Sequence, residues 1–124
     1  MTNALLVFIG GGLGAAARYW LSGTVYRWAS STFPYGTIVV NVIGCFVIGF
    51  LMTSLEERFL ATPALRIFLT IGMLGGFTTF STFSFETIKM IEDAQIQYAI
   101  VNVGMTITTC LSGTYIGTLL GRLI

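Results

Sequence analysis

The sequence predicts an all-α membrane protein with four transmembrane helices in a single domain of residues 1–124. Only 9% of the residues are charged and 55% are hydrophobic, whereas a soluble domain carries about 25% charge. The few charges are also grouped, so that residues 28–55, 67–85 and 94–121 contain no Lys, Arg, Asp or Glu. A bilayer-spanning helix needs roughly 20 apolar residues, which each of these stretches can supply.

The first predicted helix ends near its one internal charge, Arg18. Gly10 and Gly14 lie one turn apart and predict close contact with a second helix. Gly10-x-Gly12 also imitates a dinucleotide-binding turn, but such a turn needs a βαβ unit and an acidic residue about 20 positions later. The first acid in the chain is Glu56, so we discard that interpretation. The four predicted helices span residues 4–24, 36–56, 64–90 and 96–122.

The second predicted helix begins at a clear start signal. Pro34 and Gly36 precede it, and Thr37 is a cap or first-turn residue. Asn41 follows Thr37 by one turn and shares its face. An asparagine inside a span either bonds a neighbouring helix or faces a pore, and the residues alone leave both alternatives open.

The third predicted helix contains the most informative segment, Gly75-Gly76-Phe77-Thr78-Thr79-Phe80-Ser81-Thr82-Phe83-Ser84. Adjacent glycines weaken a helix, and the last seven residues are five hydroxyl side chains and two phenylalanines. Exposed backbone and hydroxyls are costly in hydrocarbon unless protein or water satisfies them. The segment therefore predicts a helix broken beside an ion or substrate path. The alternative is that the hydroxyls bond carbonyls of their own helix.

A helix that resumes after Gly76 would place Phe80, Phe83 and Ser84 on one side. Glu86 would then lie near the membrane surface, where it could pair with an arginine or line an entrance. In the fourth predicted helix, Asn102 and Thr106 are one turn apart and form a short polar stripe. Three glycines at four-residue spacing predict a groove for helix contact, namely Gly113, Gly117 and Gly121.

The chemistry available in the chain argues against an enzyme. It has no histidine, no metal-type cysteine cluster and no pair of carboxylates inside a span. Cys45 and Cys110 fall in mid-span and are interpreted as small packing residues. The remaining tools are neutral donors, phenylalanine ring edges and broken-helix backbone, which suit passive coordination of an ion. An anion is favoured, although hydroxyls and carbonyls also accept cations.

The basic residues give no orientation signal. Three lie at one predicted end of the helices and two or three at the other, so the positive-inside rule does not discriminate. A chain without orientation bias can insert both ways, which predicts an antiparallel homodimer of oppositely inserted copies. Arg18 lies beside Tyr19 and Trp20 and either reaches the headgroups or faces an aqueous vestibule.

Three motifs carry a family resemblance. The segment 75–84 closely resembles the central motif of the Fluc fluoride channels, also called the CrcB family. Gly36-Thr37-Ile38-Val39-Val40-Asn41 resembles that family's second-helix motif, and Gly11-x-x-Gly14-x-x-x-Arg18-Tyr19 its N-terminal one. The resemblance implies passive export of cytoplasmic fluoride through two pores of an antiparallel, dual-topology homodimer. It also implies a multi-pass protein of the prokaryotic (inner) cell membrane, in contact with lipid and with no nucleic-acid partner.

The resemblance also implies roles for individual residues. Phe80 and Phe83 match the pore-lining ring pair, Asn41 the pore amide donor with Thr37 nearby, and Arg18 a vestibule residue. A structural sodium ion would lie at the dimer interface, held by backbone carbonyls of Gly75 and Thr78 from both subunits. Glu86 falls where the family carries an acid. The other implied pore residues are Ser81, Thr82, Ser84, Asn102 and Thr106.

Two other functions compete with a fluoride channel. A small dual-topology multidrug exporter also uses four short helices, but such exporters carry a buried acid in the first helix, where this chain has Arg18. A structural subunit of a larger membrane complex would explain the glycine-rich helix faces. It would leave the hydroxyl- and phenylalanine-rich segment without a purpose.

Overall fold

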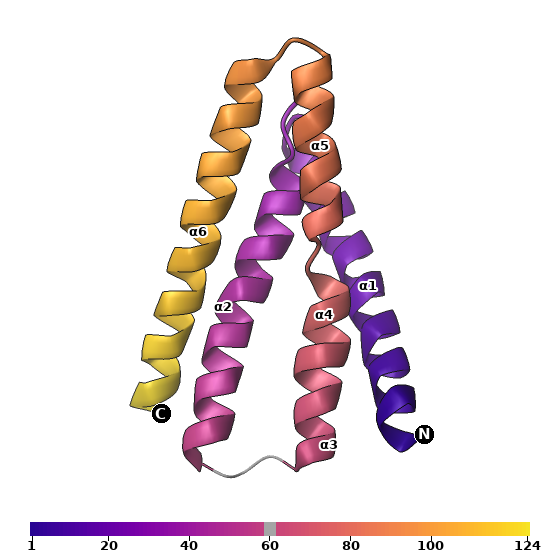
Figure 1. The fold of residues 1–124 in the computed structure, drawn as a ribbon, viewed down its shortest axis with the longest axis vertical. Helices are drawn as coiled ribbons and strands as arrows, with labels where there is room; N and C mark the ends of the chain where they lie inside the picture. The colour runs from indigo at the N-terminus through magenta and orange to yellow at the C-terminus, as the bar shows by residue number, and fades with distance from the viewer. Residues whose placement is uncertain (59–61) are drawn as a thin grey trace.

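The computed structural model describes residues 1–58 and 62–124, which form helices and no strand (Figure 1). Four helical spans in these residues are long and apolar enough to cross a membrane. The predicted fold class and the four spans are confirmed. The elements are α1 (Thr2–Trp28), α2 (Tyr35–Arg58), α3 (Pro63–Arg66), η1 (Ile67–Leu74), α4 (Gly75–Phe77), α5 (Phe80–Glu92) and α6 (Ile96–Leu123).

Local signals in the sequence begin and end these helices. Thr62 caps α3 by accepting a hydrogen bond from the Leu65 backbone N–H at 3.3 Å, and Pro63 occupies the first helical residue. At the other end of the third span, Asp93 and Ala94 make the turn into α6. Ala94 has a positive φ of 59°, the left-handed conformation that often terminates a helix.

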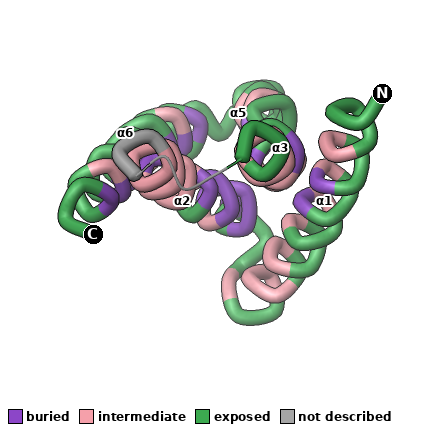
Figure 2. The backbone as a smooth tube through the Cα atoms, turned by 90° about the horizontal axis from the view of Figure 1, so that it is seen from below, coloured by how far each residue is buried: buried purple, intermediate pink, exposed green. Residues whose placement is uncertain are grey.

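The four spans form two packed pairs. α2 lies beside α6 and runs in the same direction, while α1 packs against η1 and α4 of the third span (Figure 1). Seen from below, the buried residues lie on the faces where helices meet, and the outward faces are exposed (Figure 2). The third span therefore lies between α1 and the α2–α6 pair.

Glycines allow both pairs to pack backbone against backbone. A Cβ on Gly10 would lie 2.7 Å from the carbonyl oxygen of Phe68, and one on Gly121 would lie 2.8 Å from that of Phe50. Gly14 and Gly117 are equally crowded by neighbouring backbone. These contacts confirm that the glycine-rich faces of the first and last helices are packing surfaces.

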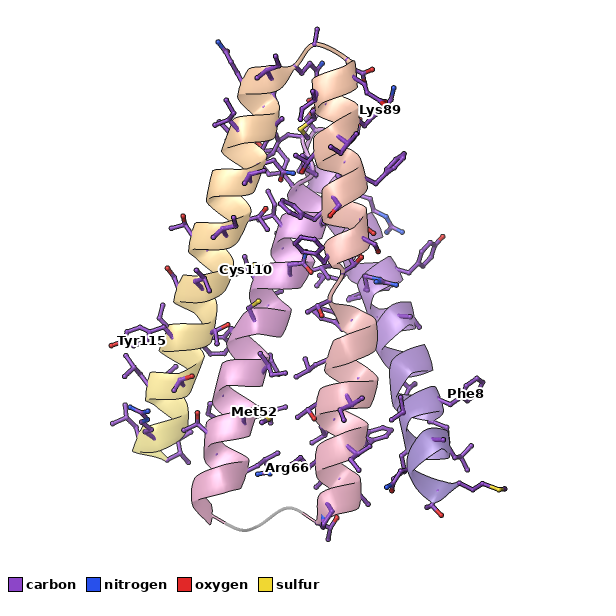
Figure 3. All side chains as sticks on the ribbon, viewed as in Figure 1. Phe8, Met52, Arg66, Lys89, Cys110 and Tyr115 are labelled. Carbon is purple, nitrogen blue, oxygen red and sulfur yellow. The ribbon has the colours of Figure 1, made fainter. Side chains whose placement is uncertain are left out.

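Large apolar side chains cover the outer surface. Phe8 of α1 and Tyr115 of α6 point away from the bundle (Figure 3), with exposed fractions of 78% and 65%. Such a surface would be an aggregation hazard in water but is what lipid-facing helices present. Together with the four spans, it shows a multi-pass membrane protein.

The third span is interrupted, but not where the glycines predicted. Gly75 and Gly76 are helical, and the interruption lies at Thr78 and Thr79, which are extended with ψ angles of 156° and 112°. Gly76 serves packing instead, because a Cβ there would lie 2.9 Å from the Cα of Gly11. The predicted break is confirmed, and its expected location is corrected by three residues, from Gly75 and Gly76 to Thr78 and Thr79.

The first half of this span also departs from the prediction of a regular α-helix. Residues Ile67–Leu74 form a π-helix, η1, whose wider turns are uncommon and often occur at functional sites. Its Gly72 lies against α1, where an added Cβ would approach the Cα of Gly10 to 3.1 Å. The π-helix is thus pressed against α1, and the short helix α4 separates it from the interruption.

Candidate functional site

The interruption is held by one asparagine. The Nδ2 of Asn41 donates to the carbonyl oxygen of Thr79 at 3.0 Å, and its Oδ1 accepts from the Thr79 backbone N–H at 2.8 Å. Both residues are buried. The side-chain amide therefore replaces the helical partners that Thr79 lacks. Asn41 therefore bonds a neighbouring helix. The second N–H of its Nδ2 is left as a donor at the site.

Thr79 also starts the helix that follows. Its Oγ1 accepts from the backbone N–H of Thr82 at 3.2 Å and lies 2.9 Å from the Thr82 hydroxyl. This is an N-cap, which fixes the direction of α5. Thr78, by contrast, donates its hydroxyl to the carbonyl of Leu74, so the alternative of bonding back along the helix holds for this residue.

The two predicted ring residues lie together on α5. The ring centroids of Phe80 and Phe83 are 5.4 Å apart and tilted by 53°, an arrangement in which ring edges, which carry positive character, can face a neighbour. Phe83 is buried, with an exposed fraction of 7%, whereas that of Phe80 is 78%. The pair thus extends from the interior of the chain to its surface.

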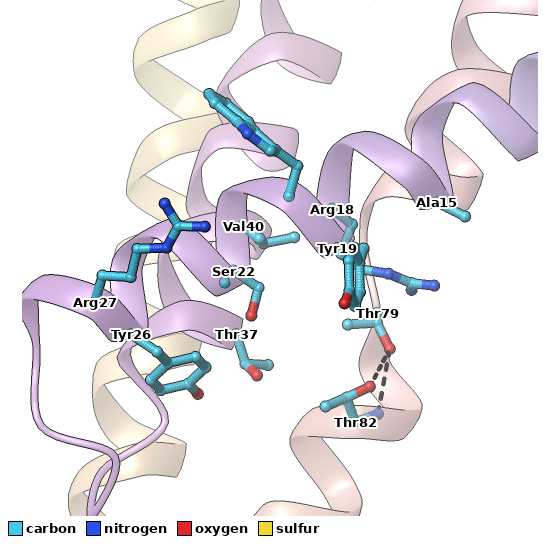
Figure 4. Close-up of a pocket in the computed structure, with 12 residues that line it drawn as sticks. Ala15, Arg18, Tyr19, Ser22, Tyr26, Arg27, Thr37, Val40, Thr79 and Thr82 are labelled. Atoms are coloured by element: carbon cyan, nitrogen blue, oxygen red, sulfur yellow. Dashed lines mark hydrogen bonds between the residues drawn. The ribbon is translucent and has the colours of Figure 1, made fainter.

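Two open cavities lie on either side of Thr79. The first, here called the arginine cleft, has a volume of about 500 Å³ and is lined by Arg18, Tyr26, Thr37, Thr79 and Thr82, among others (Figure 4). Its guanidinium groups, hydroxyls and aromatic edges all suit an anion. Arg18 therefore lines an open cavity, and its role in a vestibule stays a prediction.

The second cavity, here called the phenylalanine cleft, has a volume of about 320 Å³. Asn41, Phe80, Phe83 and Thr106 line it, and Thr79 lies in the walls of both cavities. The structure therefore brings Arg18, Thr37 and Thr82 together on one side of the interruption. It brings the amide and the ring pair together on the other side.

Glu86 pairs with a hydroxyl, not with an arginine. The Oγ1 of Thr37 donates to its Oε1 at 2.8 Å, which ties α2 to α5. Its other oxygen, Oε2, is buried without a hydrogen-bond partner among the described residues. Such an unpaired carboxylate oxygen is costly to bury. Glu86 also lines an open cavity together with Lys89, and its role at an entrance stays a prediction.

The two polar residues of α6 that were predicted to line the pore lie in different surroundings. Thr106 lines the phenylalanine cleft and donates to Oδ1 of Asn102 over 3.4 Å. Asn102 is fully buried, and its Nδ2 donates to the Thr87 hydroxyl at 2.9 Å. It links α6 to α5 and lines none of the described cavities. Ser81 and Ser84 likewise line neither cleft. The Ser81 hydroxyl nevertheless lies 3.3 Å from that of Thr79, so it joins the polar groups at the interruption.

The backbone carbonyls implied for sodium lie just before the interruption. In a continuous helix the Thr79 N–H would bond the carbonyl of Gly75, but here it bonds Asn41, which releases that oxygen. Gly75 is exposed, and a Cβ there would meet only open space apart from an oxygen 3.9 Å away. The carbonyl of Thr78 accepts from Nη1 of Arg18 over 3.5 Å and has a second lone pair. Oxygen donors of this kind fit a hard cation such as sodium.

Known proteins share much of the sequence of this chain. Residues 5–118 match the family described as "CrcB-like protein, Camphor Resistance (CrcB)". The chain belongs to the CrcB family. A relative from Geobacter sulfurreducens, named "Fluoride-specific ion channel FluC", is 48% identical over 122 residues, which cover 98% of each chain. Relatives of the same name from Geotalea daltonii and Magnetococcus marinus are 48% and 41% identical over 124 and 118 residues.

This CrcB chain contains site residues that sequence reasoning did not single out. Thr79 holds the interruption and borders both clefts, yet it was counted only as one of five hydroxyls. Its distance of three residues from Thr82 matches the spacing of an N-cap, which was a usable signal. Tyr26 in the arginine cleft and Thr87 beside Asn102 had no such signal, because their roles depend on contacts between helices.

Proposed function

We propose that the chain is a fluoride-selective ion channel that lets cytoplasmic fluoride leave the cell passively. One observation carries this proposal: the interrupted helix borders two cavities, one lined by Arg18 and the other by the Asn41 amide and the phenylalanine pair. Membership of the CrcB family and the name of its relatives support the same conclusion. Hydrogen fluoride enters cells as a neutral molecule and dissociates inside, so an inside-negative voltage suffices to expel the anion.

The donors explain how a small anion could pass. Fluoride is strongly hydrated, so a path must replace its water with many weak donors that also permit release. The arginine cleft supplies positive charge at the entrance, while the phenylalanine cleft offers the second N–H of the Asn41 amide and ring edges. The Thr106 hydroxyl would add a donor by exchanging its long 3.4 Å bond to Asn102 for one to the anion. A lysine or arginine inside the phenylalanine cleft would hold the anion tightly, and none lines it among the described residues.

We further propose that two oppositely oriented copies form the channel, with a sodium ion between them and two pores. Gly75 is exposed, and its own carbonyl oxygen is released because the Thr79 N–H bonds Asn41. Both observations support a contact surface at the interruption. The carbonyls of Gly75 and Thr78 from each copy would hold the ion, which would supply positive charge that fixes the two copies together. The even distribution of basic residues supports both orientations in the membrane.

Ion flux from liposomes tests the function. Vesicles that contain the purified protein and fluoride should release fluoride down its gradient, with no proton gradient required. A potassium ionophore is added so that potassium efflux dissipates the membrane potential that anion efflux would otherwise build up. Vesicles loaded with chloride should release it far more slowly. Equal rates for the two anions, or efflux only with a proton gradient, would contradict a passive fluoride channel.

A further inference from the structure

Two thiols lie in the wall of the phenylalanine cleft. Cys45 of α2 and Cys110 of α6 are the chain's two cysteines, and both are free thiols. They line the same cavity as Phe80 and Phe83. Figure 3 labels Cys110 about half-way along α6. Neither thiol has a part in the conduction proposed above.

The packing of α2 on α6 brings the two cysteines opposite each other. The helices run in the same direction (Figure 1), and a Cβ on Gly49 would overlap the carbonyl oxygen of Thr114. Cys45 precedes Gly49 by one turn, and Cys110 precedes Thr114 by one turn. The two side chains therefore lie opposite each other, one turn away from a backbone contact and in the wall of one cavity.

We propose that Cys45 and Cys110 form a two-sulfur site for a soft, thiophilic d¹⁰ metal ion, such as Hg²⁺, Ag⁺ or Cu⁺. Soft thiolate ligands select such ions, which accept two sulfur ligands in a near-linear arrangement. A structural zinc ion takes four nitrogen, sulfur or carboxylate ligands. The described residues contain no group of three or more His, Cys, Asp or Glu side chains that could provide them.

Metal binding at this site is a simple exchange of protons for metal. Each thiol loses one proton as its sulfur forms a bond to the metal, and both protons pass to water. The oxidation state of the metal and of the sulfurs stays the same. The cleft opens to the exterior of the chain, so it provides a route for the ion and for the protons.

A bound metal would change the cleft in two ways. It would link α2 to α6 through two metal–sulfur bonds, and it would place a heavy atom in the same wall as Asn41 and Phe83. Given the proposed function, this would narrow the route past the ring pair. The site therefore makes the channel sensitive to soft metals.

Retention of mercury by the whole purified protein tests the site without relying on transport. Wild type, Cys45→Ser, Cys110→Ser and the double variant are loaded with mercuric chloride, washed with increasing monothiol and weighed by denaturing intact-mass spectrometry. Wild type should keep one mercury per subunit, with the loss of two protons. It should need at least about tenfold more monothiol for release than either single variant, since the second sulfur is held close by. All variants are first compared by elution volume to show that they assemble.

Equal release from wild type and single variants would overturn the two-sulfur site, as would mercury that joins two subunits on a non-reducing gel. Because retention is measured without fluoride, this failure would leave the proposed channel function untouched. Fluoride efflux, normalised to each variant's own metal-free rate, should fall in mercury-loaded wild type and recover with excess dithiol. The double variant should show no such fall. Undiminished efflux from metal-loaded wild type would overturn the narrowing of the cleft.

Discussion

The side-chain amide of Asn41 bonds both backbone groups of Thr79, one at 3.0 Å and the other at 2.8 Å. One residue of α2 thereby satisfies the backbone at the interruption of the third span. Without this contact, an N–H and a carbonyl would be left unpaired in a buried place within the membrane. The interruption and the two clefts beside it therefore depend on a contact between α2 and the third span.

Replacement of Asn41 tests this contact. Asn41→Leu should lower the apparent melting temperature of the purified protein, because each buried group left unpaired costs about 1–3 kcal/mol. Asn102→Leu is the matched control, since the Thr87 hydroxyl that it leaves behind still donates to the carbonyl of Phe83. The Thr106 hydroxyl loses only a long bond of 3.4 Å. The decrease in melting temperature should be larger for Asn41→Leu than for Asn102→Leu. An equal or larger decrease for Asn102→Leu would contradict the role given to Asn41.

The ring pair should matter for conduction more than for assembly. Phe80→Ile should reduce fluoride efflux by about tenfold, the equivalent of about 1.4 kcal/mol, while elution volume stays normal because Phe80 is 78% exposed within the subunit. Phe85→Ile is the control, because Phe85 is also exposed, at 71%, and lines neither cleft. Normal efflux from Phe80→Ile in liposomes would remove the ring-edge role.

The hydrogen bond between Thr37 and Glu86 should stabilise the fold. Thr37→Val removes the donor to a partly buried carboxylate, and bonds to charged groups contribute about 1.5–3 kcal/mol. Glu86→Gln keeps an acceptor for Thr37 and removes the oxygen that lacks a partner. Melting curves should therefore show a clear loss for Thr37→Val and little or none for Glu86→Gln. The reverse order would show that the carboxylate charge itself stabilises this region.

Two neighbouring glycines should respond differently to alanine. Gly76→Ala should impair folding, because its Cβ would collide with the backbone of Gly11, whereas Gly75→Ala has room within the subunit. If the carbonyl of Gly75 holds an ion between two copies, Gly75→Ala should weaken the dimer while the subunit stays helical. Circular dichroism and light scattering separate these effects. Gly104→Ala, which meets no atom within 4 Å, is the control.

Removal of sodium tests the shared cation. In a buffer whose sodium is replaced by a large organic cation, we expect the dimer to dissociate more readily on dilution or fluoride efflux to cease. Restoring sodium should reverse the effect. Dimer stability and efflux that are both indifferent to sodium would contradict an ion held by the carbonyls of Gly75 and Thr78.

The spans were predictable from sequence because the lack of charge over about 20 residues has few explanations other than a membrane. The packing role of Gly113, Gly117 and Gly121 followed from their four-residue spacing. The location of the interruption did not follow, because adjacent glycines signal weak helix in isolation, while Gly76 is held helical against α1. Thr79, where the helix does break, carried an N-cap signal in its three-residue distance from Thr82. Its contact with Asn41 could not be read from the sequence.

The sequence indicated which residues to consider for the site better than it indicated the hydrogen bonds between them. The residues that line one cleft include four implied as pore residues, namely Asn41, Phe80, Phe83 and Thr106. Their part in conduction stays a prediction. Asn102 lies on the same helix face as Thr106, yet its amide bonds Thr87 in a fully buried contact. Whether a polar side chain faces a cavity or a neighbouring helix depends on how the helices cross. The spacing of residues within one helix does not reveal that crossing.

An experimental map of the protein in lipid with bound fluoride tests the central claim most directly, namely that uncharged groups at the interruption replace the water around the anion. We predict an antiparallel pair of subunits with a continuous route beside Thr79 and anion density next to Asn41 and the Phe80–Phe83 pair. An interruption that faces lipid, or clefts filled by side chains with no continuous route, would contradict the claim.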